Sequence, residues 1–459
     1  MEEWNVLREL CSRTVRYLEK KGVAAEAFFT YEKTIEVSIR NSILLTQTSQ
    51  KDSGVGIRVV EDGRAGYACT NVMTEEAIMK AGDMAAGMSR VSSVLPGLVL
   101  PEPGSYPVVQ DVYDKRIEQI TGEETVDIAH RALAAAEGID PRVRVKSGVI
   151  MFTSGWRGVV SSLGIDGEEQ GTRATIYLGG VGESGDEVTG ICSDYECSRT
   201  AAISPESLGE SVGEKVIQMF HPQPVETGTT TVILAPEAGD YQLAEVLVDA
   251  LRGDSVMTGR SFWTGKLGSS VASPFLSISD NGVLRNGFSS RKFDDEGYPS
   301  GEAPVVNEGI LTSYLHNAWS AHALAMENTG NASRYSKGFD TVRNTIGYGY
   351  RTGPEIYCSN LVVHPGTKSR DELVSEVSQG VLVESMAGFP QAGSGVISAQ
   401  LSQAFAIRNG EIQHPVKGMI SGVAFDWLTR ISDVGNDSKQ YENTVLPSLR
   451  IEDVHVIGR

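Results

Sequence analysis

One carboxylate in this sequence stands where catalytic carboxylates are often found, at the start of a helix that follows a strand. The β-branched run 231–233 leads into Pro236 and Glu237, and apolar residues at helical spacing continue to Leu251. In a zinc peptidase, histidines on either side of such a Glu bind the metal and the carboxylate acts as general base. Here the flanking positions hold Pro236 and Tyr241, so the sequence has the helix and the carboxylate without the metal ligands.

A structural role for Glu237 is the simpler interpretation. Proline at the first helical position followed by Glu suits a helix N-terminus on both steric and dipole grounds. A general base needs an activated water, and no neighbouring residue in the sequence would hold one. We therefore expect Glu237 to start the helix and keep a catalytic role only as the lesser possibility.

The other residues capable of chemistry do not form a recognisable ligand set. None of the seven histidines has a tight metal-ligand spacing, and His316 and His322 are six residues apart, on different faces of a helix. Asp294 and Asp295 are consecutive, so their side chains diverge, and an acidic turn is favoured over a cation loop. The five cysteines form one C-x4-C pair without a partner cluster, which is typical of reduced thiols.

Charge and composition exclude several functional classes. The 459 residues carry 40 basic and 59 acidic side chains, a net charge of −19 that argues against direct binding to DNA or RNA. No apolar run is long enough to span a membrane. The N-terminus is charged from its second residue and lacks the apolar stretch of a signal peptide, which predicts a cytoplasmic protein.

The elements that would position these residues predict an α+β fold. Alternating stretches within 25–70 indicate antiparallel strands with a turn at 61–63, and capping residues Thr74 and Thr121 predict helices after them. Residues 221–230, HPQPVETGTT, are the predicted boundary between a mixed N-terminal domain (1–221) and a β-rich C-terminal domain (229–459) with few helices. In that second half, helical patterns are confined to 236–252, 316–326 and 369–380.

Several segments together resemble the TldD/PmbA family, also called modulators of DNA gyrase, and most closely its PmbA (TldE-like) branch. They occur in family order over nearly the whole chain: GVGIRVVEDGRAGYACT (54–70), GRSFWTGKLGSSVASP (259–274), FDDEGYPS (293–300), NEGILTSYLHN (307–317), TGNASR (329–334), IRNGEIQHPV (407–416) and SDVGND (432–437).

The resemblance implies a heterodimeric zinc peptidase in which only the TldD-like subunit carries the ligands, H-E-x-x-x-H and a later Cys. Position by position, the first His corresponds to Pro236, the Glu to Glu237, the second His to Tyr241 and the Cys to Leu401. Pro and Leu offer no donor, and a neutral Tyr does not replace an imidazole. We therefore expect no zinc in this chain and zinc in the TldD-like partner.

The resemblance also implies that the pair trims unfolded or modified peptides, with this chain as a non-catalytic subunit. Its glycine-rich C-terminal strands would let an extended peptide approach the backbone. Two alternatives stay open. The chain could be a homodimeric peptidase with a non-standard site, for which several of Glu237, His316, His322, Asp294 and Asp295 would have to converge, or a peptide-binding adaptor without a peptidase partner.

Overall fold

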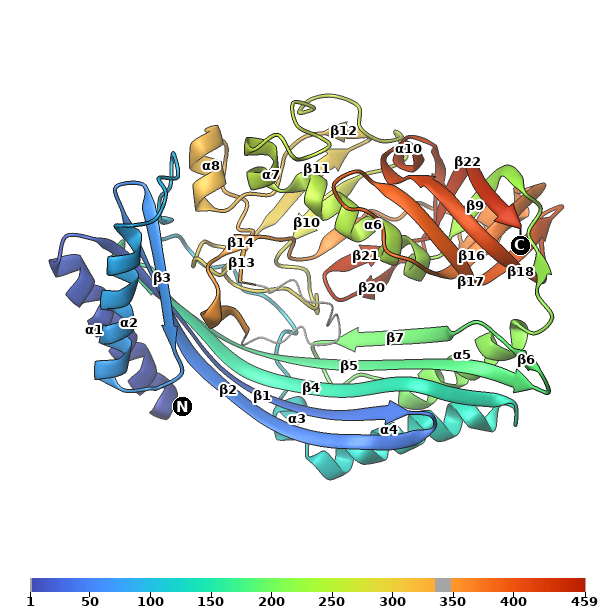
Figure 1. Ribbon diagram of the computed structural model, residues 1–459, viewed down its shortest axis with the longest axis horizontal. Coiled ribbons are helices and arrows are strands. Elements are labelled where there is room, and N and C mark those ends of the chain that lie inside the picture. Colours follow the sequence, from blue (N-terminus) through green and yellow to red (C-terminus); the bar gives the residue numbers. More distant parts are fainter. Residues whose placement is uncertain (1, 335–347, 459) are drawn as a thin grey trace.

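A long antiparallel sheet built from the first half of the chain curves beneath the rest of the molecule in the view of Figure 1. The computed structural model describes residues 2–334 and 348–458. The strands of this sheet follow the order β3-β2-β1-β4-β5-β6, and β7 also pairs with β5. Their bounds are β1 Ala24–Arg40, β2 Ile43–Glu61, β3 Arg64–Thr70, β4 Val143–Ser161, β5 Asp166–Ser184, β6 Glu187–Val188 and β7 Cys192–Ser198. Asp62 and Gly63 take the positive φ angles of 51° and 68° that the predicted tight turn requires.

Helices cover this sheet at one end and along one face. They are α1 Glu2–Lys20, α2 Glu75–Ser89, α3 Lys115–Gln119, α4 Gly122–Gly138 and α5 Pro205–Gln218. Both predicted helix starts are confirmed. The Thr74 hydroxyl accepts a hydrogen bond from the amide of Ala77, and Thr121 forms a reciprocal capping box with Glu124. The apolar face of α1 packs with α2 onto the sheet in one buried cluster.

The contact between β3 and α2 leaves no room for a side chain at Gly66. A Cβ there would lie 1.9 Å from the carbonyl oxygen of Ala85 and 2.3 Å from the amide nitrogen of Ser89. We expect Gly66→Ala to lower the free energy of unfolding by about 1–3 kcal/mol, because backbone atoms have to move apart. The matched substitution Gly87→Ala, on the exposed side of α2 with nothing within 4 Å, should raise stability by up to about 1 kcal/mol. Thermal melting of the two variants gives the comparison, and equal melting temperatures would contradict it.

The second half of the chain contains a closed ring of five strands. Strands β22, β9, β16, β17 and β18 pair in sequence, and β18 pairs back to β22, so the sheet closes into a small barrel, with β19 and β8 as extensions. The bounds are β8 Gln223–Pro224, β9 Gly228–Leu234, β16 Gln379–Ala387, β17 Val396–Arg408, β18 Glu411–Val423, β19 Ile431–Val434 and β22 Leu449–Gly458. Helix α6 (Pro236–Leu251) packs beside this barrel with a shared apolar core.

A second, smaller sheet lies next to the barrel, with strand order β12-β11-β10-β15-β21-β20. The remaining strands are β10 Ile278–Asn281, β11 Glu302–Asn307, β12 Ile310–Leu311, β13 Ala332–Ser333, β14 Glu355–Ile356, β15 Leu361–Val363, β20 Lys439–Tyr441 and β21 Thr444–Leu446. The remaining helices are α7 Gly253–Met257, α8 Ala318–Leu324, α9 Arg370–Ser375, α10 Ala424–Thr429 and the 3-10 turn η1 Tyr348–Arg351. The α+β class with a β-rich second half is therefore confirmed. Among the described helices, none is both long and apolar enough to cross a membrane.

One predicted helix is shorter than expected. The pattern at 369–380 predicts a helix through residue 380, but α9 ends at Ser375 and β16 begins at Gln379. Gly380 pairs with Thr231 of β9, and a Cβ on Gly380 would lie 2.6 Å from the Thr231 carbonyl oxygen. Barrel pairing therefore takes this segment away from the helix that local periodicity favours.

A buried set of ion pairs joins the long sheet to the turn at 293–300, and we call it the interface ion network. Arg58 of β2 donates to Glu26 of β1 at 2.7 Å and to Glu296 at 2.6 Å. Arg157 of β4 binds Asp295 at 2.5 Å. Glu26 and Glu296 are fully buried. The predicted acidic turn is thus present, and its residues Asp295 and Glu296 are paired with arginines of the N-terminal sheet.

Candidate functional site

Helix α6 begins directly after barrel strand β9, at the place where the sequence predicts its carboxylate. Residue Ala235 precedes the helix without a side-chain cap, Pro236 is the first helical residue, and Glu237 lies in the first turn. The amide of Ala235 donates to the carbonyl of Val383 on the neighbouring strand at 2.9 Å, which fixes the helix start against the barrel. The predicted helix start is therefore confirmed, and the carboxylate is held at a defined position.

The partners of Glu237 come from the N-terminal half. The Ser193 hydroxyl of β7 donates to Glu237 Oε1 at 2.9 Å, and Lys215 Nζ of α5 is 3.8 Å from Oε2. Burial raises the pKa of the Glu237 carboxyl, and the nearby Lys215 ammonium offsets part of that effect. No sequence spacing pointed to Ser193 or Lys215, because they are more than 20 residues away on separate elements.

Lys215 lies closer to the carboxylate of Asp194 than to that of Glu237. Its Nζ lies 3.3 Å from Asp194 and 3.0 Å from the Ser193 carbonyl, while Lys439 approaches Asp194 at 2.6 Å. Burial alone would raise the pKa of Asp194, but the two ammonium groups and the Ser211 hydroxyl lower it to about 2. Asp194 is therefore ionised at neutral pH and is bound by two lysines.

A cavity of about 430 Å³ opens in front of Glu237. The Arg370–Glu384 ion pair on its wall measures 2.9 Å, and the Tyr441 ring stacks on Tyr195 with 6.1 Å between centroids. Burial, and then the neighbouring carboxylates, raise the pKa of the Tyr441 hydroxyl, so it stays protonated. The cavity is lined by Lys215, Ala235, Pro236, Glu237, Ser369, Arg370, Asp371, Glu384, Asp437, Lys439 and Tyr441.

The residues at the positions that the family resemblance assigns to zinc do not fit that metal. Pro236 is buried and has no donor atom, and Leu401 is 4% exposed in the apolar core of the barrel. Tyr241 is 39% exposed and packs against Phe389 with 5.4 Å between ring centroids. Burial raises the pKa of the Tyr241 hydroxyl, so it is neutral at physiological pH. Glu237 is the one residue of the four that offers a carboxylate, whereas zinc takes three or four converging ligands.

The other predicted site residues have separate local partners. His316 is fully buried, its Nδ1 lies 2.9 Å from the Ser320 hydroxyl, and burial lowers its pKa to about 4. His322 Nδ1 lies 2.9 Å from the carbonyl oxygen of Gly97. Asp294 accepts three backbone hydrogen bonds within its turn and from Ala332, and Asp295 binds Arg157. None of their hydrogen bonds or ion pairs reaches Glu237. Within residues 2–334 and 348–458, no group of three His, Cys, Asp or Glu is placed to hold a metal ion.

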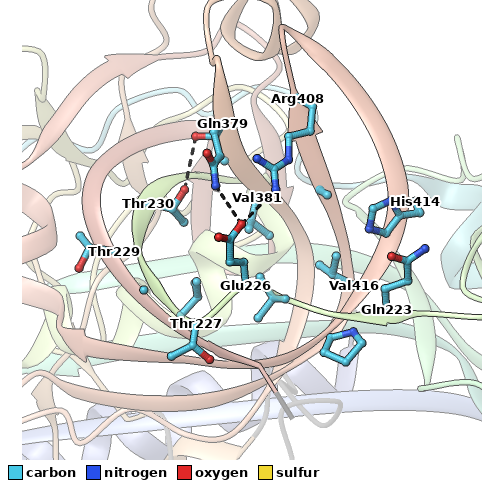
Figure 2. A pocket seen from close by; sticks show the side chains of 16 residues that line it. Gln223, Glu226, Thr227, Thr229, Thr230, Gln379, Val381, Arg408, His414 and Val416 are labelled. Atoms are coloured by element: carbon cyan, nitrogen blue, oxygen red, sulfur yellow. Dashed lines mark hydrogen bonds and ion pairs between the residues drawn. The ribbon is translucent and has the colours of Figure 1, made fainter.

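A second cavity, of about 280 Å³, lies at one mouth of the barrel (Figure 2). Some of its polar groups bond one another. Glu226 accepts from Gln379 Nε2 at 3.2 Å and pairs with Arg408 at 3.1 Å, and the Thr230 hydroxyl donates to the Gln379 carbonyl at 3.4 Å. Glu226 and Arg408 are largely exposed, with 72% and 50% of their side chains accessible. This mouth has the features of a solvated barrel end and does not bring a reactive group into an enclosed space.

Comparisons with known proteins agree across the chain. Three family models match: the PmbA/TldA metallopeptidase domain 1 at residues 25–89, the central domain at 115–220 and the C-terminal domain at 227–458. A "Metalloprotease" of Methanothermobacter thermautotrophicus is 27% identical over 88% of this chain and 86% of its own length. The "Metalloprotease PmbA" of Escherichia coli O157:H7 is 24% identical over 99% of this chain and 96% of its own.

Solved structures share the same fold. TldE from Thermococcus kodakarensis superposes with a TM-score of 0.87 at 23% identity, covering 98% of this chain and all of that one. A Thermotoga maritima protein, named as a candidate modulator of a DNA gyrase, gives a TM-score of 0.86 at 28% identity, with 98% and 99% coverage. The matched models span nearly the whole sequence and agree with the segments that first suggested the family. The chain therefore belongs to the TldD/PmbA family of metallopeptidases.

Proposed function

We propose that this chain is the TldE/PmbA-like, non-catalytic subunit of a TldD/TldE-type zinc metallopeptidase that acts on unfolded or modified peptides. The observation that carries the proposal is the donor set at the start of α6. Glu237 is present there, but Pro236, Tyr241 and Leu401 stand at the three ligand positions that the family resemblance assigns. The surroundings of Glu237 support the same conclusion, since its partners are the Ser193 hydroxyl and the Lys215 ammonium, neither of which is a zinc ligand.

A self-sufficient homodimeric peptidase is supported less well. It would need Glu237 to act with some of His316, His322, Asp294 and Asp295, yet each of these has its own partners elsewhere. A peptide-binding adaptor without a peptidase partner differs from our proposal only in what the chain associates with. The cavity beside Glu237 suits either role, so the partner has to be tested directly.

Metal content and partner dependence provide that test. We expect the purified untagged chain to contain fewer than about 0.1 equivalents of zinc by elemental analysis, because one carboxylate does not retain the ion. We expect no peptide cleavage by the chain alone, and cleavage when a TldD-type subunit that carries the zinc ligands is added. One equivalent of zinc that resists dialysis would overturn the proposal, and cleavage that the partner subunit performs equally well alone would favour the adaptor.

The variant Glu237→Gln separates a silent subunit from an enzyme. If Glu237 is not a general base, the reconstituted pair should cleave a neutral unfolded peptide within about twofold of the unmodified rate. Loss of a general base would instead reduce the rate by about 100-fold or more. The control variant Glu226→Gln removes the same charge from the second cavity, at the barrel mouth, and should leave the rate unchanged.

A further inference from the structure

The carboxylate of Glu237 is incompletely neutralised in its cavity. Oε1 accepts the Ser193 hydroxyl, but Oε2 accepts no hydrogen bond from any described residue, and its nearest cation is Lys215 at 3.8 Å. Lys215 is itself closer to Asp194 and to the Ser193 carbonyl. Because Asp194 also binds Lys439, one aspartate occupies both lysines of the cavity wall.

The remaining charged side chains of the cavity include more carboxylates than cations. Its lining holds four carboxylates, from Glu237, Asp371, Glu384 and Asp437, and three cations, from Lys215, Arg370 and Lys439. Arg370 is paired with Glu384. One turn further along α6, burial raises the pKa of Asp240 to about 7, with the charges of Glu442, Glu245 and Glu237 adding to the effect. The lining therefore holds one more carboxylate than cations, and Lys215, which lies 3.8 Å from Glu237, is shared with Asp194.

The shape and the aromatic wall fit a cationic side chain. A cavity of about 430 Å³ is within the size range of small-ligand pockets and has room for a long side chain. The Tyr441 ring forms part of its wall, stacks on Tyr195 and has the Lys439 ammonium 5.4 Å from its centroid, so this wall already contacts one cation. Tyrosine rings and carboxylates together are the groups that bind ammonium and guanidinium ions.

We propose that this cavity binds the ammonium or guanidinium group of a Lys or Arg side chain in the bound peptide, with Glu237 Oε2 as its acceptor. This inference rests on the proposed function, since it assumes that the chain meets peptides. It assigns to the retained glutamate a role in recognising the substrate. The class of peptide that the subunit favours is then one with a basic residue at the position that reaches α6.

The test compares two fluorescein-labelled heptapeptides that are identical except for a central Arg or its neutral isostere citrulline. Both are blocked at their N- and C-termini, so that the central side chain is the only difference in charge. We expect fluorescence anisotropy with the purified chain to give a Kd about tenfold lower for the Arg peptide, as one charge-assisted hydrogen bond would produce. Glu237→Gln should abolish the preference without weakening binding of the citrulline peptide, and Glu237→Asp should restore part of it.

Control variants distinguish a failure of this inference from a failure of the proposed function. Glu226→Gln makes the same charge change at the barrel mouth and should preserve the tenfold preference, so loss of preference there would indicate a general charge effect and overturn the inference. Melting temperatures within a degree or two of the unmodified chain would show that the isosteric Glu237→Gln variant is folded. Equal binding of both peptides to the unmodified chain would overturn the inference and leave the proposed function standing. Failure of the chain to bind either peptide would count against both.

Discussion

Replacing Arg58 by Met should lower the free energy of unfolding by about 3–5 kcal/mol, the largest effect on stability that we expect from one substitution. The Arg58 guanidinium compensates two carboxylates that are fully buried, Glu26 and Glu296. Without it, Glu296 loses its only ion-pair partner among the described residues and Glu26 keeps Arg334 alone. The loss should appear as a fall in melting temperature and in the urea midpoint of the transition that involves the long sheet.

A matched control and a rescue define this prediction. Arg13→Met removes the same side chain from an exposed pair with Glu9, 51% and 53% accessible, and should change stability by less than about 1 kcal/mol. Adding Glu296→Gln to Arg58→Met should recover part of the loss, because the buried charge is removed together with its partner. An Arg58→Met variant as stable as the Arg13→Met variant would contradict the argument.

The interface ion network includes contacts that the sequence alone does not predict. The residues 293–300 predict an acidic turn, and the turn is present, with the Gly297 amide bonded to the Asp294 carbonyl at 3.0 Å. The carboxylates of the turn are nonetheless buried, and although Arg291 pairs with Asp295 from four residues away, two of their arginine partners lie 138 and 238 residues away. A local charge pattern does not identify partners at that separation, so the sequence predicts the turn and leaves the network undetermined.

In the candidate site, too, local features are predictable from the sequence and contacts between distant segments are not. Helix starts depend on a few adjacent residues, and for this reason local patterns correctly predict the starts at Thr74, Thr121 and Pro236. The closed barrel and the shortened helix α9 depend on pairing between β9 and β16, which lie about 150 residues apart in the chain. The Glu237 cavity depends on β7, α5 and β20 meeting the start of α6, and the sequence therefore predicts the carboxylate without its neighbours.

Replacing Asp194 of β7 and Asp240 of α6 by Asn should change stability in opposite directions, and this is the second large effect. Asp194 has a pKa of about 2 in the folded chain, below the value of about 4 in an unfolded one. Its ionised form therefore stabilises the folded state above pH 4, and this contribution is lost as the pH falls toward 2. We expect Asp194→Asn to cost about 2 kcal/mol at neutral pH, since Lys215 and Lys439 would lose their shared partner.

Asp240 has the reverse linkage. Its pKa of about 7 in the folded chain exceeds the unfolded value of about 4, so the folded state holds a proton that the unfolded state has released. Stability consequently falls as the pH rises from 4 through 7. Asp240→Asn should remove this penalty and increase the free energy of unfolding at pH 8.5 by an amount on the order of 2–3 kcal/mol, with little change at pH 4.5. The gain should appear as a higher melting temperature at pH 8.5. Its amide oxygen can still accept the Thr444 hydroxyl that now bonds the carboxylate.

The contrast between the two variants tests the charge distribution that the peptide-binding inference uses. Because burial and then neighbouring carboxylates raise the Asp240 pKa, whereas two lysines lower that of Asp194, Asp194→Asn should be destabilising at pH 8.5 while Asp240→Asn is stabilising at the same pH. Melting curves in matched buffers at pH 4.5 and 8.5 measure both, and a gain for Asp240→Asn that is equal at the two pH values would contradict the raised pKa. A cationic peptide that enters the cavity should relieve part of the same repulsion. The Arg heptapeptide should therefore raise the melting temperature of the unmodified chain at pH 8.5 more than the citrulline heptapeptide does, and this difference should shrink in Asp240→Asn.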